Sequence, residues 1–399
     1  YEPHIAVDPT NPDHLAAIVI AVSDFEWALG CKINLVLYTS SDGGATWSEQ
    51  MPFATTRPGG DGVVGFGPDG TLYAVGLWGG RIAINRSNAD GQMTPANRAF
   101  FGAISGNDKP WLTIDPHNGA LYVPYTGPTG GNHEYKGIVL QRSTDGGAMW
   151  SDPVEIEQGV ELSANVAGQE VPPVGAQAML GNDDNLAVAW VWSPGVDNWP
   201  AGVWVATSDD GGETFSALRQ ITETWGIIST AAYNGIYYVL YRRGAKQAQE
   251  LAVAISQDGR ATWESSLVSG DIPLYFDLDK APGVNIAPDG TLDVVFYAHG
   301  EDAPACIDLE AFRKRREEGW VDACVYDVYY TFSTDGGQTF SLPLKLNEKP
   351  IVGSRFVRIQ GSSRPGDIGM ASTNEYAYPT WIDTRGTDGT QAYTVRIER

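Results

Sequence analysis

The chain has 399 residues and a formal net charge of −23, from 26 Lys and Arg against 49 Asp and Glu. Such an acidic surface repels phosphate backbones and anionic lipid headgroups, which argues against binding to nucleic acid or to a membrane. The 47 Gly, 24 Pro and 11% aromatic residues favour many short strands joined by tight turns, and the 42% of hydrophobic residues suffice for a large core.

Seven segments repeat one pattern along the chain: a short apolar strand, a turn with Asp, Asn or Gly, and a stronger apolar strand. Apolar runs of this length between turn residues predict β-hairpins. Their recurrence at intervals of 49 to 84 residues indicates a repeat fold. The segments begin at Ile5, Val63, Leu112, Gln177, Ser229, Asn285 and Gly369.

A second repeat follows a predicted third strand, with the form Ser-x-Asp-x-Gly-x-x-aromatic. In a hairpin tip the Asp carboxylate accepts backbone N–H bonds, Gly supplies a positive φ, and the aromatic ring packs between sheets. The Asp residues are therefore predicted to be structural. The copies span Ser40–Trp47, Ser143–Trp150, Ser208–Phe215 and Ser333–Phe340, and a fifth, Ser256–Trp263, has Arg260 in place of Gly.

This second repeat resembles the Asp-box, or BNR repeat, of sialidases and other secreted β-propellers. The resemblance covers nearly the whole chain and implies an all-β fold. Seven hairpins predict a single seven-bladed β-propeller over residues 1–399, with six blades, the number in sialidases, as the alternative. The Asp-boxes are expected on the face opposite the functional site.

One helical segment, Asp308–Trp320, is predicted inside an insertion over residues 300–325 of the sixth blade. It is expected either to form a lid or rim of the site or to act as a packing arm or dimer contact. Cys306 and Cys324 flank it, and they are either a disulfide or two unrelated thiols. The chain starts at Tyr1 inside a strand-like pattern, which suggests a mature or trimmed product from which an export signal, if there was one, has been removed. A secreted or periplasmic location is expected.

The functional face of a propeller is where each inner strand begins and each second strand ends. Those positions carry acids, bases and aromatic rings, which suit sugar stacking, carboxylate binding and acid–base catalysis. The alternative is that these charges pair across blades and close the ring. The inner-strand starts are Glu2, His4, Asp61, Asp108, Lys109, Glu170, Asp279, Lys280, Arg364 and Asp367.

From these positions and the second-strand ends we select candidates by chemistry. Carboxylates and a phenol are the candidate catalytic groups, and cations, His and Trp are the candidate groups for an anionic glycan. The catalytic candidates are Asp24, Asp61, Glu170 and Tyr241; the substrate-binding candidates are Arg81, Arg242, Arg243, Arg364, Arg385, Trp192, His133 and His299.

The resemblance to sialidases is partial at the site. Sialidases clamp the substrate carboxylate with three arginines, and the first sits where this chain has Glu2. Asp24 or Glu26 resembles the acid/base loop in position, Glu170 the family's Glu, and Arg242 or Arg243 a later arginine. The resemblance thus implies the fold more strongly than sialic acid as the substrate.

Three functions are compatible with these residues. The first is a sialidase-like glycoside hydrolase on an acidic or exo-terminal sugar, with carboxylates such as Asp61 and Glu170. The second is a polysaccharide lyase on uronate-containing glycans, in which His133, His299 or Tyr241 removes a proton and Arg243 neutralises the carboxylate. The third is a non-catalytic propeller that binds a glycan or a protein.

No cofactor is expected, because the sequence has no Walker loop and no dinucleotide-binding fingerprint. His4, His133 and His299 lack the spacing of zinc ligands. Acidic turns such as the one from Asp8 to Asp13 have the residue types that bind Ca²⁺, but these are also ordinary turn residues.

Overall fold

The computed structural model describes the whole chain apart from nineteen short stretches. In the described residues every regular element is a strand. Within the described residues, no helix is long and apolar enough to cross a membrane. The stretches outside the described residues are 24–31, 54–56, 94–98, 102–106, 128–136, 157–164, 167–168, 171–172, 183–184, 193–200, 225, 227, 246–247, 260–261, 273, 275–280, 300–324, 353–365 and 386–389.

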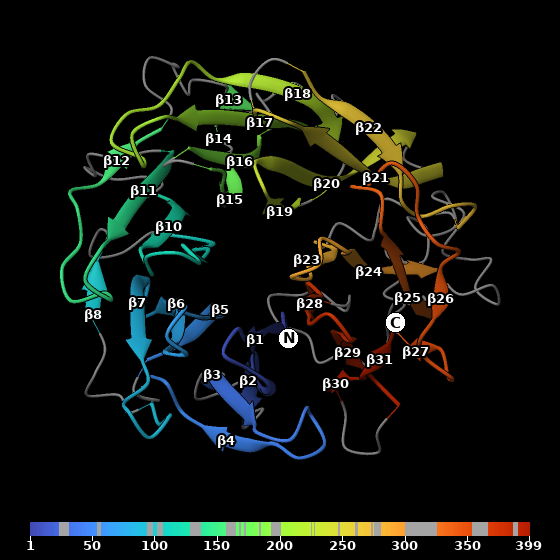
Figure 1. Ribbon diagram of the computed structural model, residues 1–399, viewed down its shortest axis with the longest axis horizontal. Helices are drawn as coiled ribbons and strands as arrows, with labels where there is room; N and C mark the ends of the chain where they lie inside the picture. Colours follow the sequence, from blue (N-terminus) through green and yellow to red (C-terminus); the bar gives the residue numbers. More distant parts are fainter. Residues whose placement is uncertain are drawn as a thin grey trace.

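Seven antiparallel sheets stand in a ring around a central axis, and each is built from consecutive strands (Figure 1). The prediction of a seven-bladed propeller is confirmed, and the six-bladed alternative is wrong. We number the sheets as blades 1 to 7 in chain order. The predicted helix and both flanking cysteines lie outside the described residues.

The inner strand of each blade comes first in its blade, and the outer strands follow in order. Blade 1 contains β1 (His4–Asp8), β2 (Asn11–Ser23), β3 (Lys32–Ser40) and β4 (Ser48–Gln50). Blade 2 contains β5 (Gly59–Phe66), β6 (Leu72–Trp78), β7 (Arg81–Arg86) and β8 (Ala99–Phe101). Blade 3 contains β9 (Thr113–Ile114), β10 (Leu121–Thr126), β11 (Ile138–Ser143) and β12 (Val154–Glu155). Blade 4 contains β15 (Val174–Leu180), β16 (Leu186–Trp192), β17 (Ala201–Ser208) and β18 (Arg219–Thr224). Blade 5 contains β19 (Ser229–Tyr233), β20 (Ile236–Ala245), β21 (Ala248–Ser256) and β22 (Glu264–Leu267). Blade 6 contains β23 (Gly283–Ile286), β24 (Leu292–His299), β25 (Val325–Ser333), β26 (Leu344–Lys345) and β27 (Ile351–Val352). Blade 7 contains β28 (Gly369–Ser372), β29 (Tyr376–Asp383), β30 (Gln391–Thr394) and β31 (Ile397–Glu398). A separate two-stranded sheet pairs β13 (Asn165–Val166) with β14 (Gln169–Glu170).

The core lies between neighbouring blades, where side chains from facing sheets interlock. Trp190 of β16, for example, is completely buried between blades 3 and 4 with Ile138 and Leu140 of β11. The ring closes because β1 of the first blade contacts β28 of the last. Closure fixes every inner strand at the centre.

The Ser-x-Asp turns lie together on one face, which we call the lower face. In the first of them Ser40 Oγ donates to Asp42 Oδ1 (2.8 Å) and accepts from the Gly44 N–H (2.9 Å), and Thr46 N–H donates to Asp42 Oδ1 (2.8 Å). Bonds from the Thr46 side chain and backbone and from Ser40 lower the pKa of Asp42 to about 2. The Gly43 N–H donates to the Asp13 carbonyl, so this turn lies beside the tip of the β1–β2 hairpin.

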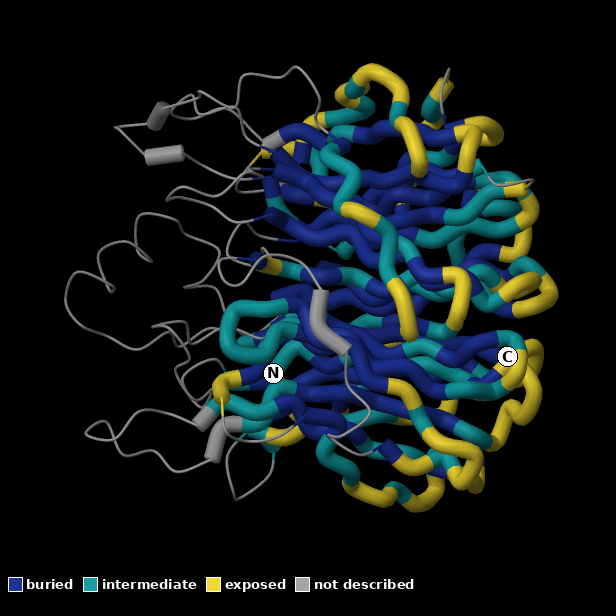
Figure 2. Tube along the Cα trace, turned by 90° about the vertical axis from the view of Figure 1, so that its left-hand side faces the viewer, coloured by how far each residue is buried: buried dark blue, intermediate teal, exposed yellow. Residues whose placement is uncertain are grey.

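The upper face is the opposite one, where the inner strands begin. In Figure 2 many exposed turns, in yellow, lie on the side marked C, and the N-terminal segment that leads into β1 lies toward the other. The start of β1 and the end of β2 pair at His4 and Ile18, far from the hairpin tip. The face assignment made from the sequence therefore agrees with the geometry.

Candidate functional site

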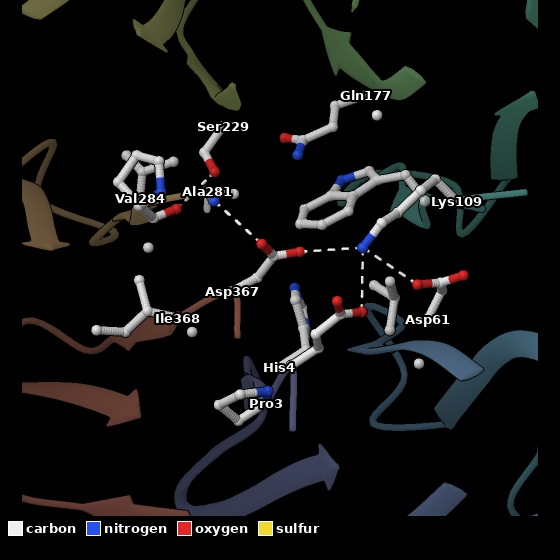
Figure 3. Close-up of a pocket in the computed structure, with 18 of the residues that line it drawn as sticks. Pro3, His4, Asp61, Lys109, Gln177, Ser229, Ala281, Val284, Asp367 and Ile368 are labelled. Atoms are coloured by element: carbon white, nitrogen blue, oxygen red, sulfur yellow. Dashed lines mark hydrogen bonds and ion pairs between the residues drawn. The ribbon is translucent and has the colours of Figure 1, made fainter. Parts of the chain in front are cut away.

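A cavity of about 70 Å³ lies on the axis at the upper face, and all seven blades line it. It has an acidic part and an apolar part. The acidic part comes from the segments that lead into the inner strands, and Val63, Val284, Ile368 and Met370 contribute to the apolar part. Figure 3 shows Asp61, Lys109 and Asp367 turned toward one another across this cavity.

Lys109, just before β9 in blade 3, is the centre of an ion cluster. Its Nζ lies 3.0 Å from Glu2 Oε2, 3.1 Å from Asp61 Oδ1 and 3.2 Å from Asp367 Oδ2. These carboxylates belong to blades 1, 2 and 7, so the cluster joins four blades. The Lys109 side chain is 22% exposed, and the three carboxylate side chains are 15–22% exposed. We call these four residues the axial cluster.

Three members of the axial cluster have a left-handed backbone. Glu2, Asp61 and Lys109 have φ values of 49°, 48° and 44°, and among the described non-glycine residues only Asn234 shares this conformation. Each such residue costs on the order of 1 kcal/mol or more, and such strain is concentrated at functional sites. The left-handed conformation recurs at three residues around one cavity. This recurrence indicates that the fold tolerates a loss of stability in order to direct these side chains toward the axis.

A β-bulge explains how Asp61 reaches the axis. Gly60 pairs with Leu77 and Val63 with Val75, so β5 has one more residue than β6 between these pairs. A bulge re-aims the side chain of the extra residue. Gly62 follows Asp61, and a Cβ at that position would lie 2.7 Å from Leu35, so the close approach of blades 1 and 2 requires glycine there.

The carboxylates keep Lys109 charged. Burial by itself lowers the pKa of a lysine, but Asp367, Glu2 and Asp61 outweigh it and raise the pKa of Lys109 well above its ordinary value. Lys109 is thus a permanent ammonium and not a general base. It neutralises one of three negative charges that face each other across the cavity.

Asp367 is held from two sides. Its Oδ1 accepts the backbone N–H of Ala281 (3.0 Å), and its Oδ2 accepts from Lys109. Both partners are donors, an arrangement that suits a carboxylate with a negative charge. Behind it the wall is closed by Ser229, whose hydroxyl donates to the Pro282 carbonyl (2.5 Å).

His4 forms the wall below Glu2 and is electrically neutral. Its Nδ1 accepts the Val64 N–H (3.3 Å), and its ring meets the Trp111 indole edge-on with centroids 5.1 Å apart. Burial lowers the pKa of His4 to about 4. With Nδ1 occupied as an acceptor, neutral His4 has only its Nε2–H to offer.

The structure thus brings together Glu2, His4, Asp61, Lys109 and Asp367, all inner-strand starts in the sequence. Of these only Asp61 had a predicted catalytic role. Trp111 and Gln177 also line the cavity and were not selected. Trp111 follows Lys109 by two residues, and this proximity was the one signal in the sequence that points to it.

Two of the candidates, Tyr241 and Trp192, lie away from the cavity. Tyr241 is buried between blades 4 and 5, with its hydroxyl 2.9 Å from Ser265 Oγ on the outermost strand. Trp192 is buried between blades 3 and 4 against Trp204. Neither side chain is in the axial cavity, because the ends of the second strands lie one layer further from the axis than the inner strands.

The arginine candidates among the described residues do not line the cavity either. Arg243 is paired with Glu250 on the neighbouring strand (3.1 Å), and both are well exposed. Arg385 is bound to the buried Asp383 of its own blade and stacks on Tyr393. The remaining second-strand candidates do not line the cavity. Arg81 lies at the β6–β7 turn, Arg242 is buried in β20, and His299 is buried against Tyr326.

Of the predicted pocket lined by Glu170, Arg243 and Arg364, Arg243 does not line the axial cavity. Arg364, Asp24 and His133 lie outside the described residues, as does the side chain of Glu170. In the described cavity lining the cation is a lysine and the excess charge is negative, whereas the sequence led us to expect an arginine-rich anion site. In the described residues no cluster of three His, Cys, Asp or Glu side chains is arranged to hold a metal ion.

Residues 103–390 match the family described as the BNR repeat-like domain. The chain belongs to this family. No curated protein matches the sequence.

Solved structures similar to this BNR repeat-like protein include carbohydrate-active propellers. A polysaccharide lyase, an ulvan lyase, is 11% identical with a TM-score of 0.57, covering 100% of this chain and 94% of its own. The endosialidase of phage phi92 is 11% identical with a TM-score of 0.56, covering 99% of this chain and 66% of its own. A protein of unknown function from Dyadobacter fermentans is 13% identical with a TM-score of 0.50, covering 100% and 94%. At these identities the likeness is one of fold.

Proposed function

We propose that the protein is a glycoside hydrolase that acts on the terminal sugar of a glycan, with the axial cluster as its catalytic site. The observation that carries the proposal is the convergence of three carboxylates on Lys109 at a cavity to which every blade contributes. An axial cavity accepts the end of a glycan more easily than its middle. Carboxylates are the groups that glycoside hydrolysis requires.

We assign the two reacting roles to Asp61 and Asp367. Asp61 uses Oδ1 to bind Lys109, and Oδ2 is the oxygen that exchanges a proton with the glycosidic oxygen or a water. Asp367, fixed by Lys109 and the Ala281 N–H, stabilises the positive charge that develops on the sugar ring. Trp111 supplies an apolar face for the ring.

A lyase reaction is less well supported by the described residues. It requires a base for the C5 proton and a cation for the uronate carboxylate. In the described cavity lining, His4 has its Nδ1 occupied and Lys109 stays protonated. The earlier candidates Tyr241 and His299 are buried away from the axis, and His133 is outside the described residues.

One screen distinguishes hydrolase, lyase and binder. The full chain is incubated with polysaccharides and with aryl glycosides, and the products are measured both as reducing ends and as ultraviolet absorbance. We expect reducing ends without absorbance; absorbance would identify a lyase, and binding without either product would identify a binding propeller.

Matched variants locate the reaction. Asp61→Asn should lower kcat by about 10²-fold or more, the usual contribution of a positioned acid or base. Asp367→Asn should lower kcat by about 10²-fold, the usual contribution of a group that stabilises charge in the transition state. Glu264→Gln removes an exposed carboxylate from the outer strand of blade 5 and should leave kcat unchanged. Equal activity in all three variants would remove the axial cluster from the mechanism.

We also propose that the protein works outside the cytoplasm, secreted or in the periplasm, where polymeric glycans are encountered. The acidic surface, with a formal net charge of −23, is compatible with this location. Fractionation of the native source, with immunodetection in each fraction, tests it. Recovery with the cytoplasmic fraction alone would reject it.

A further inference from the structure

The charge of the axial cavity is unusual for a site that would hold an anionic sugar. Its charged described lining residues are Glu2, Asp61, Asp367 and Lys109, so three carboxylates face one ammonium. His4, the other titratable group in the lining, is neutral near pH 7. The formal charge of this lining is therefore −2, and like charges in a partly buried site repel strongly.

The ammonium of Lys109 has no capacity left for a ligand. It carries three N–H donors, and three carboxylate oxygens lie within 3.2 Å of Nζ. A substrate carboxylate would have to displace one of them and leave that carboxylate buried without its cation. The cost of such an exchange falls only on substrates that carry a negative charge.

The same cavity suits a neutral sugar. Carboxylate oxygens are acceptors, and sugar hydroxyls are donors that can reach them. Trp111, Val63 and Ile368 provide apolar surface for the C–H groups of a sugar ring. A neutral sugar ring thus gains charge-assisted hydrogen bonds at this site without electrostatic repulsion from the carboxylates.

We propose that the axial site takes an uncharged sugar residue and rejects one that carries a carboxylate, and that Glu2 determines this selectivity. The proposal rests on the proposed function for its choice of ligand class. Glu2 is the carboxylate of the axial cluster without an assigned step in the reaction, so its negative charge is the one that the proposed reaction does not use. Its backbone is fixed by close packing on Gly366, where a Cβ would lie 2.7 Å from the Glu2 nitrogen.

Selectivity is measured on sugars matched in every respect except the carboxylate. Binding of glucose against glucuronate, galactose against galacturonate, and mannose against mannuronate is titrated calorimetrically with the full chain. We expect at least one neutral sugar to bind, and its acid partner to bind at least tenfold more weakly. If no neutral sugar binds, or if the acids bind as well or better, the proposal is overturned.

Glu2→Gln tests the assigned residue. The amide keeps the size of the side chain and removes one negative charge, so the ratio of neutral to acidic affinity should fall by about tenfold. Glu264→Gln is the matched control and should keep the wild-type ratio. An unchanged ratio in folded Glu2→Gln would show that Glu2 does not determine selectivity.

Salt gives a second measurement that needs no variant. Raising the ionic strength to about 1 M shortens the screening length to about 3 Å, so the wild-type preference should narrow as the acid binds better. A preference that widens as salt is added contradicts an electrostatic origin. Neutral-sugar binding without turnover of the matching aryl glycoside would reject hydrolysis while leaving the selectivity in place.

Discussion

Lys109 and Asp367 are 258 residues apart in the sequence, and Lys109 Nζ donates to Asp367 Oδ2 across 3.2 Å. The pair joins blade 3 to blade 7 over the axis, and Glu2 and Asp61 bring blades 1 and 2 into the same cluster. The site therefore exists only when the ring is closed. Partial unfolding of the terminal blade would remove Asp367 and with it one of the two reacting groups.

Lys109→Met should lower both stability and activity. Methionine matches the length of the stem but leaves three carboxylates facing one another, and breaking such a buried ion cluster costs on the order of 3 kcal/mol. Because the pKa of Lys109 is raised on folding, its contribution is complete below the ordinary value of 10.5 and is lost as pH rises through the higher folded value. Urea unfolding should show a constant wild-type advantage from pH 7 to 10 that shrinks above this range. An advantage that grows with pH would contradict the assignment.

His4→Gln should make the protein less sensitive to acid. The pKa of His4 is lowered from 6.5 to about 4, so between these values the unfolded chain binds a proton that the folded chain does not. Stability is then lost as pH falls from 6.5 toward 4, by up to about 3 kcal/mol for this group. Gln retains an acceptor for the Val64 N–H. Unfolding at pH 7 and pH 4.5 should show a smaller loss in the variant, and equal losses would reject this role of His4.

Asp42→Ala should lower the melting temperature and leave kcat unchanged in the folded protein. The substitution removes the acceptor of the Thr46 N–H and the partner of Ser40 in an exposed turn on the lower face. Because the pKa of Asp42 is lowered to about 2, its stabilising effect is present above pH 3.8 and is lost as pH falls through 2. Asp152→Ala, an exposed Asp just beyond another such turn, is the control for thermal unfolding. Loss of activity in folded Asp42→Ala would show that the two faces are reversed.

Arg243→Ala should leave activity and stability nearly unchanged. Arg243 pairs with Glu250 at an exposed position of blade 5, and exposed ion pairs contribute about 0–1 kcal/mol. This outcome is the opposite of that for an arginine in an anion-binding pocket. Initial rates on the substrate identified by the screen measure it, and a loss of tenfold or more would return Arg243 to the site.

Local sequence patterns were sufficient for the architecture. Each hairpin and each Ser-x-Asp turn is specified within about 15 residues, through apolar alternation, turn residues and a Ser–Asp–Gly hydrogen-bond set such as that of Ser40, Asp42 and Gly44. Seven copies of such a unit can bury their apolar faces only against one another, so the repeat count predicted the ring. The same reasoning placed Glu2, Asp61, Lys109 and Asp367 at inner-strand starts.

The chemistry of the site was decided by the tertiary structure. From the sequence, Arg243 and Arg385 were as plausible as Lys109 as the cation of the site, because all three stand at strand ends on the upper face. Distance from the axis separates them: Arg385 is bound within its own blade by Asp383, whereas Lys109 reaches the cavity from a left-handed backbone. Ring closure alone determines which charges meet, since the ion pairs of the axial cluster join residues that no local pattern relates. The sequence by itself therefore determined the blades and their faces, and the closed ring determined that an acidic cluster around one lysine occupies the axis.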